Sequence, residues 1–175
     1  MAREYDVVVR YHAFDLHPGI PLEGQKIPWD PATMAARRGR FAEAAAAEGL
    51  EVGERTHWYN SAPAHQAALW ADERGKGAEF RHQVFRAYFV DDRNIGSADV
   101  LGEIATGLGL DAAGLRCALS EEAYAGRVEQ EYEAARELGV TAVPTFVAGG
   151  YAVVGAHPYE SFERLMEAVG GQRRG

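Results

Sequence analysis

The spacing of apolar positions changes twice along this chain of 175 residues. Near the start, residues 7–14 carry consecutive β-branched side chains without strict alternation, which is typical of a strand covered on both faces. From residue 30 to residue 138 the apolar side chains recur at helical spacing, and the pattern predicts helices only. The remaining residues return to short β-rich runs before a last amphipathic segment. The predicted order is therefore strand, helical block, hairpin and helix.

Capping residues divide the helical block. Asp30, which precedes a proline, is a typical helix start, and Asp111 is predicted to start a short helix later in the chain. Ser120 is predicted to start a long helix that ends at Gly139, where a left-handed C-terminal cap is common. An aromatic stripe within residues 80–89 is interpreted as core packing rather than as a ligand site.

The residues from 140 onward have a different pattern. Two β-rich runs, residues 140–147 and 151–154, flank the pair Gly149-Gly150, which predicts a β-hairpin. An amphipathic helix is predicted to follow and to end before residue 170. Residues 172–175 are expected to form a frayed tail.

Composition and charge exclude several kinds of partner. The chain has 47% hydrophobic and 10% aromatic residues, which is enough to build a core. It carries 18 Lys and Arg against 26 Asp and Glu, so its formal net charge is −8. This balance argues against nucleic acid and an anionic membrane as partners. No apolar run approaches the roughly 18–20 residues that cross a bilayer.

The residues that bear chemistry are few. Cys117 is the single cysteine, which excludes an intrachain disulfide, a cysteine zinc cluster and a two-cysteine redox motif within these residues. We predict that Cys117 is a small buried core residue, with a reactive thiol as the alternative. None of the six histidines has the His-x-x-x-His spacing of a helical metal pair, so no metal site is predicted.

An ordered set of short motifs extends over almost the whole chain. The motifs are Asn60-Ser61 with Ala64-His65, Phe85-Arg86-Ala87-Tyr88-Phe89, Ile95-Gly96, Gly139-Val140, Val143-Pro144-Thr145-Phe146 and Gly155-Ala156-His157-Pro158. Together they resemble the DsbA-like thioredoxin family. The closest resemblance is to its cytoplasmic branch, beside the polyketide-cluster oxidoreductases and the 2-hydroxychromene-2-carboxylate isomerases.

The resemblance implies an α/β, thioredoxin-like fold with an inserted all-helical domain. Residues 1–28 and 139–171 would form a partial thioredoxin-like domain, and residues 29–138 the helical insertion domain. Family members usually begin with a strand and a Cys-x-x-Cys helix, and this first β-α unit is missing from the sequence. Without that unit, the strands on either side of the missing strand would lack backbone hydrogen-bond partners. Each buried backbone group without a partner costs on the order of 1–3 kcal/mol. We therefore expect either an N-terminally truncated gene product, with a start codon assigned too late, or a homodimer that completes the sheet.

The resemblance also implies a site. Pro144 would follow a cis peptide bond, and Val143, Pro144 and Thr145 would bind a thiol or disulfide substrate protein, or a small thiol, through the backbone. No catalytic residue is assigned, because the attacking dithiol is absent. The expected function is that of a cytoplasmic thiol–disulfide oxidoreductase family member that is redox-inactive in this form.

Two other functions remain open at this point. The first is a glutathione-dependent isomerase or a kappa-class-transferase-like enzyme, in which Asn60 and Ser61 would contact glutathione instead of capping a helix. Those relatives commonly place an Asp after the second hairpin strand, where this chain has Gly155-Ala156-His157-Pro158. The second is a non-catalytic module that binds a peptide or a partner protein. No cofactor is expected other than glutathione in the first alternative.

Overall fold

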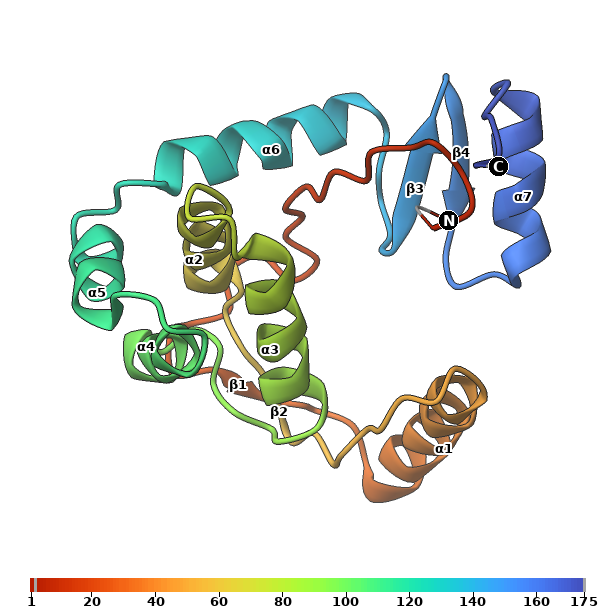
Figure 1. Ribbon diagram of the computed structural model, residues 1–175. Helices are drawn as coiled ribbons and strands as arrows, with labels where there is room; N and C mark the ends of the chain where they lie inside the picture. Colours follow the sequence, from red (N-terminus) through yellow and green to blue (C-terminus); the bar gives the residue numbers. More distant parts are fainter. Residues whose placement is uncertain (2, 175) are drawn as a thin grey trace. The chain divides into compact units, whose positions relative to one another are not determined.

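The computed structural model describes residue 1 and residues 3–174, and it divides the chain into two compact units (Figure 1). The smaller unit consists of Met1–Leu16 with Gln130–Gly175, and the larger unit is His17–Glu129. The sequence pattern places these boundaries later, at residues 28 and 138.

The larger unit is mostly helical. Its helices are α1 (Pro31–Ala47), α2 (Ala62–Asp72), α3 (Gly77–Phe89), α4 (Ala98–Gly107), α5 (Ala112–Ser120) and the first residues of α6 (Ala125–Glu137). The two predicted aspartate caps are confirmed. The Asp30 carboxylate accepts the N–H groups of Ala32 and Thr33 at 3.0 Å, and Asp111 does the same at the start of α5. These bonds satisfy donors that have no partner within the helix.

The core of the larger unit lies among α2, α3, α4 and α5. Its largest side chains are Trp70, Phe80, Leu101 and Leu115, each at most 2% exposed. The predicted aromatic stripe is only partly core, because Phe85 is 54% exposed. Residues 80, 84 and 87 are spaced three and four apart and share one helix face, and position 85 lies on another face.

A short β-ribbon interrupts the helical block. β1 (Gln25–Lys26) pairs antiparallel with β2 (His57–Trp58), with Gln25 opposite Trp58. The prediction that residues 30–138 are helical throughout is therefore wrong at β2. A strand of two residues is too short to produce a period in the apolar pattern, which explains why the sequence does not reveal it.

The start of α6 is a second correction. Ser120 is the last residue of α5 rather than the cap of the next helix, and α6 begins at Ala125. The N–H of Glu121 donates to Cys117 O at 2.9 Å, which continues the hydrogen bonding of α5 past the predicted start. Glu122 then has a φ of 51°, a left-handed conformation that interrupts the right-handed helix. As predicted, the chain turns at Gly139 after α6, with a φ of 72°.

The smaller unit contains the predicted hairpin and terminal helix. β3 (Thr145–Ala148) pairs antiparallel with β4 (Tyr151–Val154), and Gly149 and Gly150 have φ values of 53° and 84°, as a type I′ turn requires. α7 (Tyr159–Ala168) packs beside the hairpin (Figure 1). Leu165 and Met166 of α7 are buried together with Tyr5, which is 2% exposed.

The N-terminal segment differs from the prediction. In the part of the chain that the structure describes, residues 7–14 form no strand, because no neighbouring segment pairs with them. The first regular pairing is instead a bridge between Tyr5 and Arg173, with the Asp6 N–H donating to Gln172 O at 2.8 Å. Residues 172–174 are therefore held by backbone hydrogen bonds, contrary to the expected fraying, and Gly175 lies outside the described residues.

None of the helices within the described residues has both the length and the apolar character needed to cross a bilayer.

Candidate functional site

An apolar groove of about 630 Å³ is the candidate site, and it lies wholly within the smaller unit. Val8 and Val9 of the N-terminal segment line it, as do Phe146 and Val147 of β3 and Leu138 after α6. These side chains are strongly exposed: 84% for Val8, 69% for Leu138 and 50% for Val147. Contiguous exposed apolar side chains of this kind mark a binding surface, whereas single ones do not.

The groove carries little charge. Among the described residues that line it, Arg10 is the only side chain from the Asp, Glu, Lys and Arg set, and His12 adds an imidazole. Arg10 is exposed, and no ion pair in the described structure involves it. The lining therefore favours an apolar ligand that has an acidic group near Arg10.

The outer edge of β3 offers backbone hydrogen-bonding groups. The Gly155 N–H donates to Pro144 O at 2.7 Å, on the side of β3 that faces β4. Residues of an antiparallel strand alternate between bonding to one neighbour and to the other. The N–H and C=O of Thr145 and Val147 therefore point away from β4, and β4 is the only described strand that pairs with β3. This open edge is available to an extended peptide.

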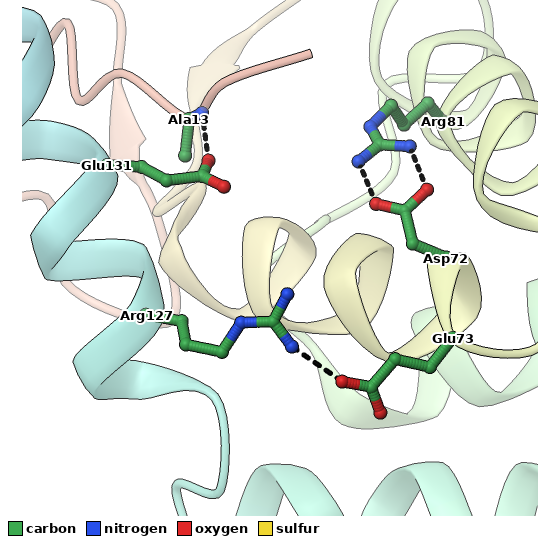
Figure 2. Close-up of polar contacts among 6 residues, drawn as sticks. All are labelled: Ala13, Asp72, Glu73, Arg81, Arg127 and Glu131. Atoms are coloured by element: carbon green, nitrogen blue, oxygen red, sulfur yellow. Dashed lines mark hydrogen bonds and ion pairs between the residues drawn. The ribbon is translucent and has the colours of Figure 1, made fainter. Parts of the chain in front are cut away.

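The opposite side of the groove is also open. No backbone–backbone hydrogen bond among the described residues involves Val8, Val9 or Arg10. The far end of this segment is fixed by the Ala13 N–H, which donates to Glu131 Oε2 of α6 at 2.6 Å (Figure 2). Ala13 itself is 6% exposed. The near end is held by the bridge between Tyr5 and Arg173, so the segment is anchored at both ends and has free backbone groups along its middle.

The predicted substrate-binding residues lie at this groove. The Val143–Pro144 peptide bond is cis. Val143, 44% exposed, and Thr145 line the groove, and Pro144 joins them. The Thr145 hydroxyl donates to Ala142 O at 2.6 Å, which leaves its backbone groups for the open edge.

Sequence reasoning missed part of the site. The lining also includes Phe162, Leu165 and Met166 of α7 and residues 7–10. The run Val7-Val8-Val9 is a visible signal, although its pattern predicts a buried strand. For the α7 residues the pattern predicts only the apolar face of an amphipathic helix, because periodicity does not show which buried side chains reach a groove.

Asn60 has a structural role in the larger unit. Its side-chain Nδ2 donates to Ile20 O at 2.7 Å, and its Oδ1 accepts the Ala62 N–H at 2.9 Å at the start of α2. Ser61 makes no side-chain capping bond. The capping interpretation of Asn60 is therefore confirmed, and its polar atoms are engaged within the protein.

Ion pairs in the larger unit join helices. Arg127 of α6 contacts the Glu73 carboxylate at 2.5 Å, and Arg81 pairs with Asp72 (Figure 2). The Tyr124 hydroxyl also donates to Glu73, and this hydrogen bond, followed by the Arg127 contact, lowers the pKa of Glu73. Among the described residues no group of three or more His, Cys, Asp or Glu side chains could hold a metal ion. These charges support packing and carry no evident chemistry.

Cys117 is exposed, so the prediction that it is buried is wrong. Leu115 forms the buried face of α5, and a residue two positions later lies about 200° around the helix. The Cys117 thiol donates to Glu121 Oε1 at 3.3 Å. This hydrogen bond and the negative charge of Glu121 raise the pKa of the thiol above its ordinary value. The thiol is therefore protonated at neutral pH and is a poor nucleophile.

This assignment gives a testable expectation for thiol reactivity. Glu121→Gln removes the negative charge, so the pKa of Cys117 falls and the thiolate fraction at neutral pH increases. We expect iodoacetamide to alkylate the folded E121Q variant several-fold faster than the wild type, as measured by mass spectrometry. Glu122→Gln, which removes a neighbouring carboxylate without a contact to the thiol, serves as the control and should react at the wild-type rate. Equal rates for E121Q and E122Q would contradict the role of Glu121.

Comparisons with known proteins identify the family of this chain. A family model described as a DSBA-like thioredoxin domain matches residues 1–167. The uncharacterized protein YwbO of Bacillus subtilis (strain 168) is 30% identical over 168 residues, which cover 92% of this chain and 82% of that protein.

Two solved structures are similar in fold. A probable DsbA oxidoreductase from Streptomyces coelicolor has a TM-score of 0.83 and 31% identity, over 91% of this chain and 74% of that one. A 2-hydroxychromene-2-carboxylate isomerase has a TM-score of 0.73 at 20% identity, over 95% and 81% of the two chains, and shows the fold alone. The chain therefore belongs to the DsbA-like thioredoxin domain family and has a thioredoxin-like α/β fold with a helical insertion.

Proposed function

We propose that this chain is a member of the thiol–disulfide oxidoreductase family that binds an extended thiol or disulfide substrate along Val143, Pro144 and Thr145. The second part of the proposal is that the 175-residue polypeptide does not itself catalyse disulfide exchange. The observation that carries the binding part is the open edge of β3, where the backbone groups of Thr145 and Val147 face an apolar groove. The resemblance to the cytoplasmic branch of the family supports a cytoplasmic location within the same proposal.

The redox part follows from the composition. Turnover of a disulfide by exchange needs an attacking thiolate and a second thiol that resolves the mixed disulfide. The chain has one cysteine, and the hydrogen bond from Cys117 to Glu121 raises the pKa of that thiol. A single protonated thiol does not complete the cycle, so binding without turnover is the activity that these residues support.

A variant at the edge of β3 tests the binding part. Val147→Pro removes the N–H that points into the groove and leaves the bonds to β4 in place, a position where an edge strand tolerates proline. We expect this variant to bind a fluorescein-labelled, apolar peptide with one alkylated cysteine roughly three- to tenfold more weakly, because one backbone hydrogen bond is lost. Fluorescence anisotropy provides the measurement.

Val147→Ile is the matched control, since it keeps an apolar β-branched side chain and the N–H and should bind the peptide as the wild type does. Equal affinities for V147P and V147I would contradict the β3 edge as the binding site. The redox part is tested separately by the turbidity assay of insulin reduction with dithiothreitol. We expect turbidity to increase at the same rate with this chain as with dithiothreitol alone. A rate that increases with protein concentration would contradict it.

A further inference from the structure

We propose that a second copy of this chain docks in the apolar groove, by antiparallel pairing of residues 6–10 of the two copies around Val8. The segment reads Asp6-Val7-Val8-Val9-Arg10, with an acid at one end, a base at the other and three valines between them. Two copies of such a segment are complementary to each other when they run antiparallel. The inference rests on the proposed function only in using the same β3 edge.

Charge complementarity sets the register. When Val8 faces Val8 of the second copy, Asp6 faces Arg10 of that copy at one end, and the same pair recurs at the other end. Opposite charges on facing residues of an antiparallel pair stabilise it, and like charges destabilise it. Arg10 is exposed, and no described ion pair involves it. Asp6 is 80% exposed, and its contact with Arg174 spans 3.3 Å at the surface, where an ion pair contributes little.

The groove accepts the strand that this pairing brings in. A strand beside residues 7–10 enters the groove that these residues and β3 line together. On its other side it meets the outward N–H and C=O groups of Thr145 and Val147. Apolar side chains now exposed, including those of Val8 and Leu138, become covered. Because the contact is two-fold symmetric, each copy fills the groove of the other, and the exchange of identical elements is a common route to dimers.

Self-association would also regulate the proposed binding site. The second copy and a substrate peptide use the same edge of β3, so they compete for it. A ligand that binds only the monomer shifts the equilibrium toward the monomer. The dimer is then the closed form of the protein, and substrate peptide is expected to reduce the dimer fraction.

Charge-reversal variants test the register with the full chain. Sedimentation velocity over a wide range of protein concentration should show a monomer–dimer equilibrium for the wild type. Asp6→Arg and Arg10→Asp each place like charges at both ends of the pairing, and each should weaken self-association by about tenfold or more. The two single variants mixed together, and the double variant D6R/R10D, regain opposite charges and should associate as the wild type does.

Arg174→Ala is the matched control, because it removes the side-chain contacts to Asp6 and to Tyr5 O, keeps the backbone bond from Arg174 N–H to Glu4 O, and leaves Asp6 and Arg10 of the proposed pairing unchanged. Circular dichroism checks that every variant folds. A monomeric wild type at all concentrations, or single variants that associate as the wild type does, would overturn the inference, as would a mixture that remains monomeric. The peptide-binding measurement on V147P stands apart from these results, so a failure of self-association and a failure of the proposed function are distinguishable.

Discussion

Replacing Phe80 with alanine is expected to lower the free energy of unfolding by about 3–5 kcal/mol. The ring is 0% exposed and lies in the core of the larger unit with Trp70, Leu101 and Leu115. Truncation removes its apolar contacts and leaves a cavity in a close-packed interior that relaxes only partly. Urea denaturation followed by tryptophan fluorescence measures the loss directly.

Phe85→Ala is the matched control, because it makes the same chemical change on the same helix. That side chain is 54% exposed, so its truncation should change the free energy of unfolding by less than about 1 kcal/mol. A loss for Phe80→Ala as small as the loss for Phe85→Ala would show that the packing among α2, α3, α4 and α5 does not stabilise the larger unit as described.

A second large effect is expected at Gly53. A Cβ atom added there would lie 1.9 Å from Val90 O and 2.8 Å from Val90 C. Both are backbone atoms, and the Gly53 N–H donates to Phe89 O at 2.8 Å. Neither of the two backbone segments can therefore move aside without losing this hydrogen bond. We expect Gly53→Ala to lower the free energy of unfolding by about 1–3 kcal/mol, the range seen for overpacking.

Gly39→Ala provides the contrast, since nothing lies within 4 Å of an added Cβ at that position in α1. Alanine stabilises a helix interior relative to glycine by about 0.5–1 kcal/mol, so this variant should be more stable than the wild type. The two glycine variants should therefore shift the urea midpoint in opposite directions. A Gly53→Ala variant as stable as the wild type would contradict the close approach to Val90.

The parts of the fold that could be predicted from sequence are those determined by local chemistry. Asp30 and Asp111 cap helices through bonds to N–H groups two and three residues away, and Gly149-Gly150 supplies the positive φ values of a tight turn. Such signals lie within a few residues of their effect. Their effect therefore does not depend on the tertiary contacts of the rest of the chain.

The failures involve contacts that the type of a residue does not reveal. Residues 7–14 have the composition of a strand, but a strand exists only where another segment pairs with it, and none of the described residues does so. Ser120 has the chemistry of a cap, yet the backbone bonds that end α5 include it in the earlier helix. Residue type predicts that Cys117 is buried, whereas its position on α5, about 200° around the helix from the buried Leu115, leaves it exposed.

The candidate site shows the same division. Val143, Pro144 and Thr145 could be singled out from a short motif, and Val143 and Thr145 line the groove. The opposite side, residues 7–10, could not be assigned to the site, because its position depends on the bridge between Tyr5 and Arg173 and on the bond from Ala13 to Glu131. Both contacts join residues more than a hundred positions apart, beyond the reach of any local pattern.

The division of the chain at Leu16 and Glu129 has a spectroscopic consequence. All three tryptophans, Trp29, Trp58 and Trp70, lie in the larger unit, whereas the smaller unit has tyrosine as its strongest absorbing side chain. Indole emission excited at the red edge of absorption therefore reports the melting of the larger unit alone. Backbone dichroism, which sees both units, would reveal a hairpin and terminal helix that melt separately, and the difference between the two signals measures the cooperativity of the whole chain.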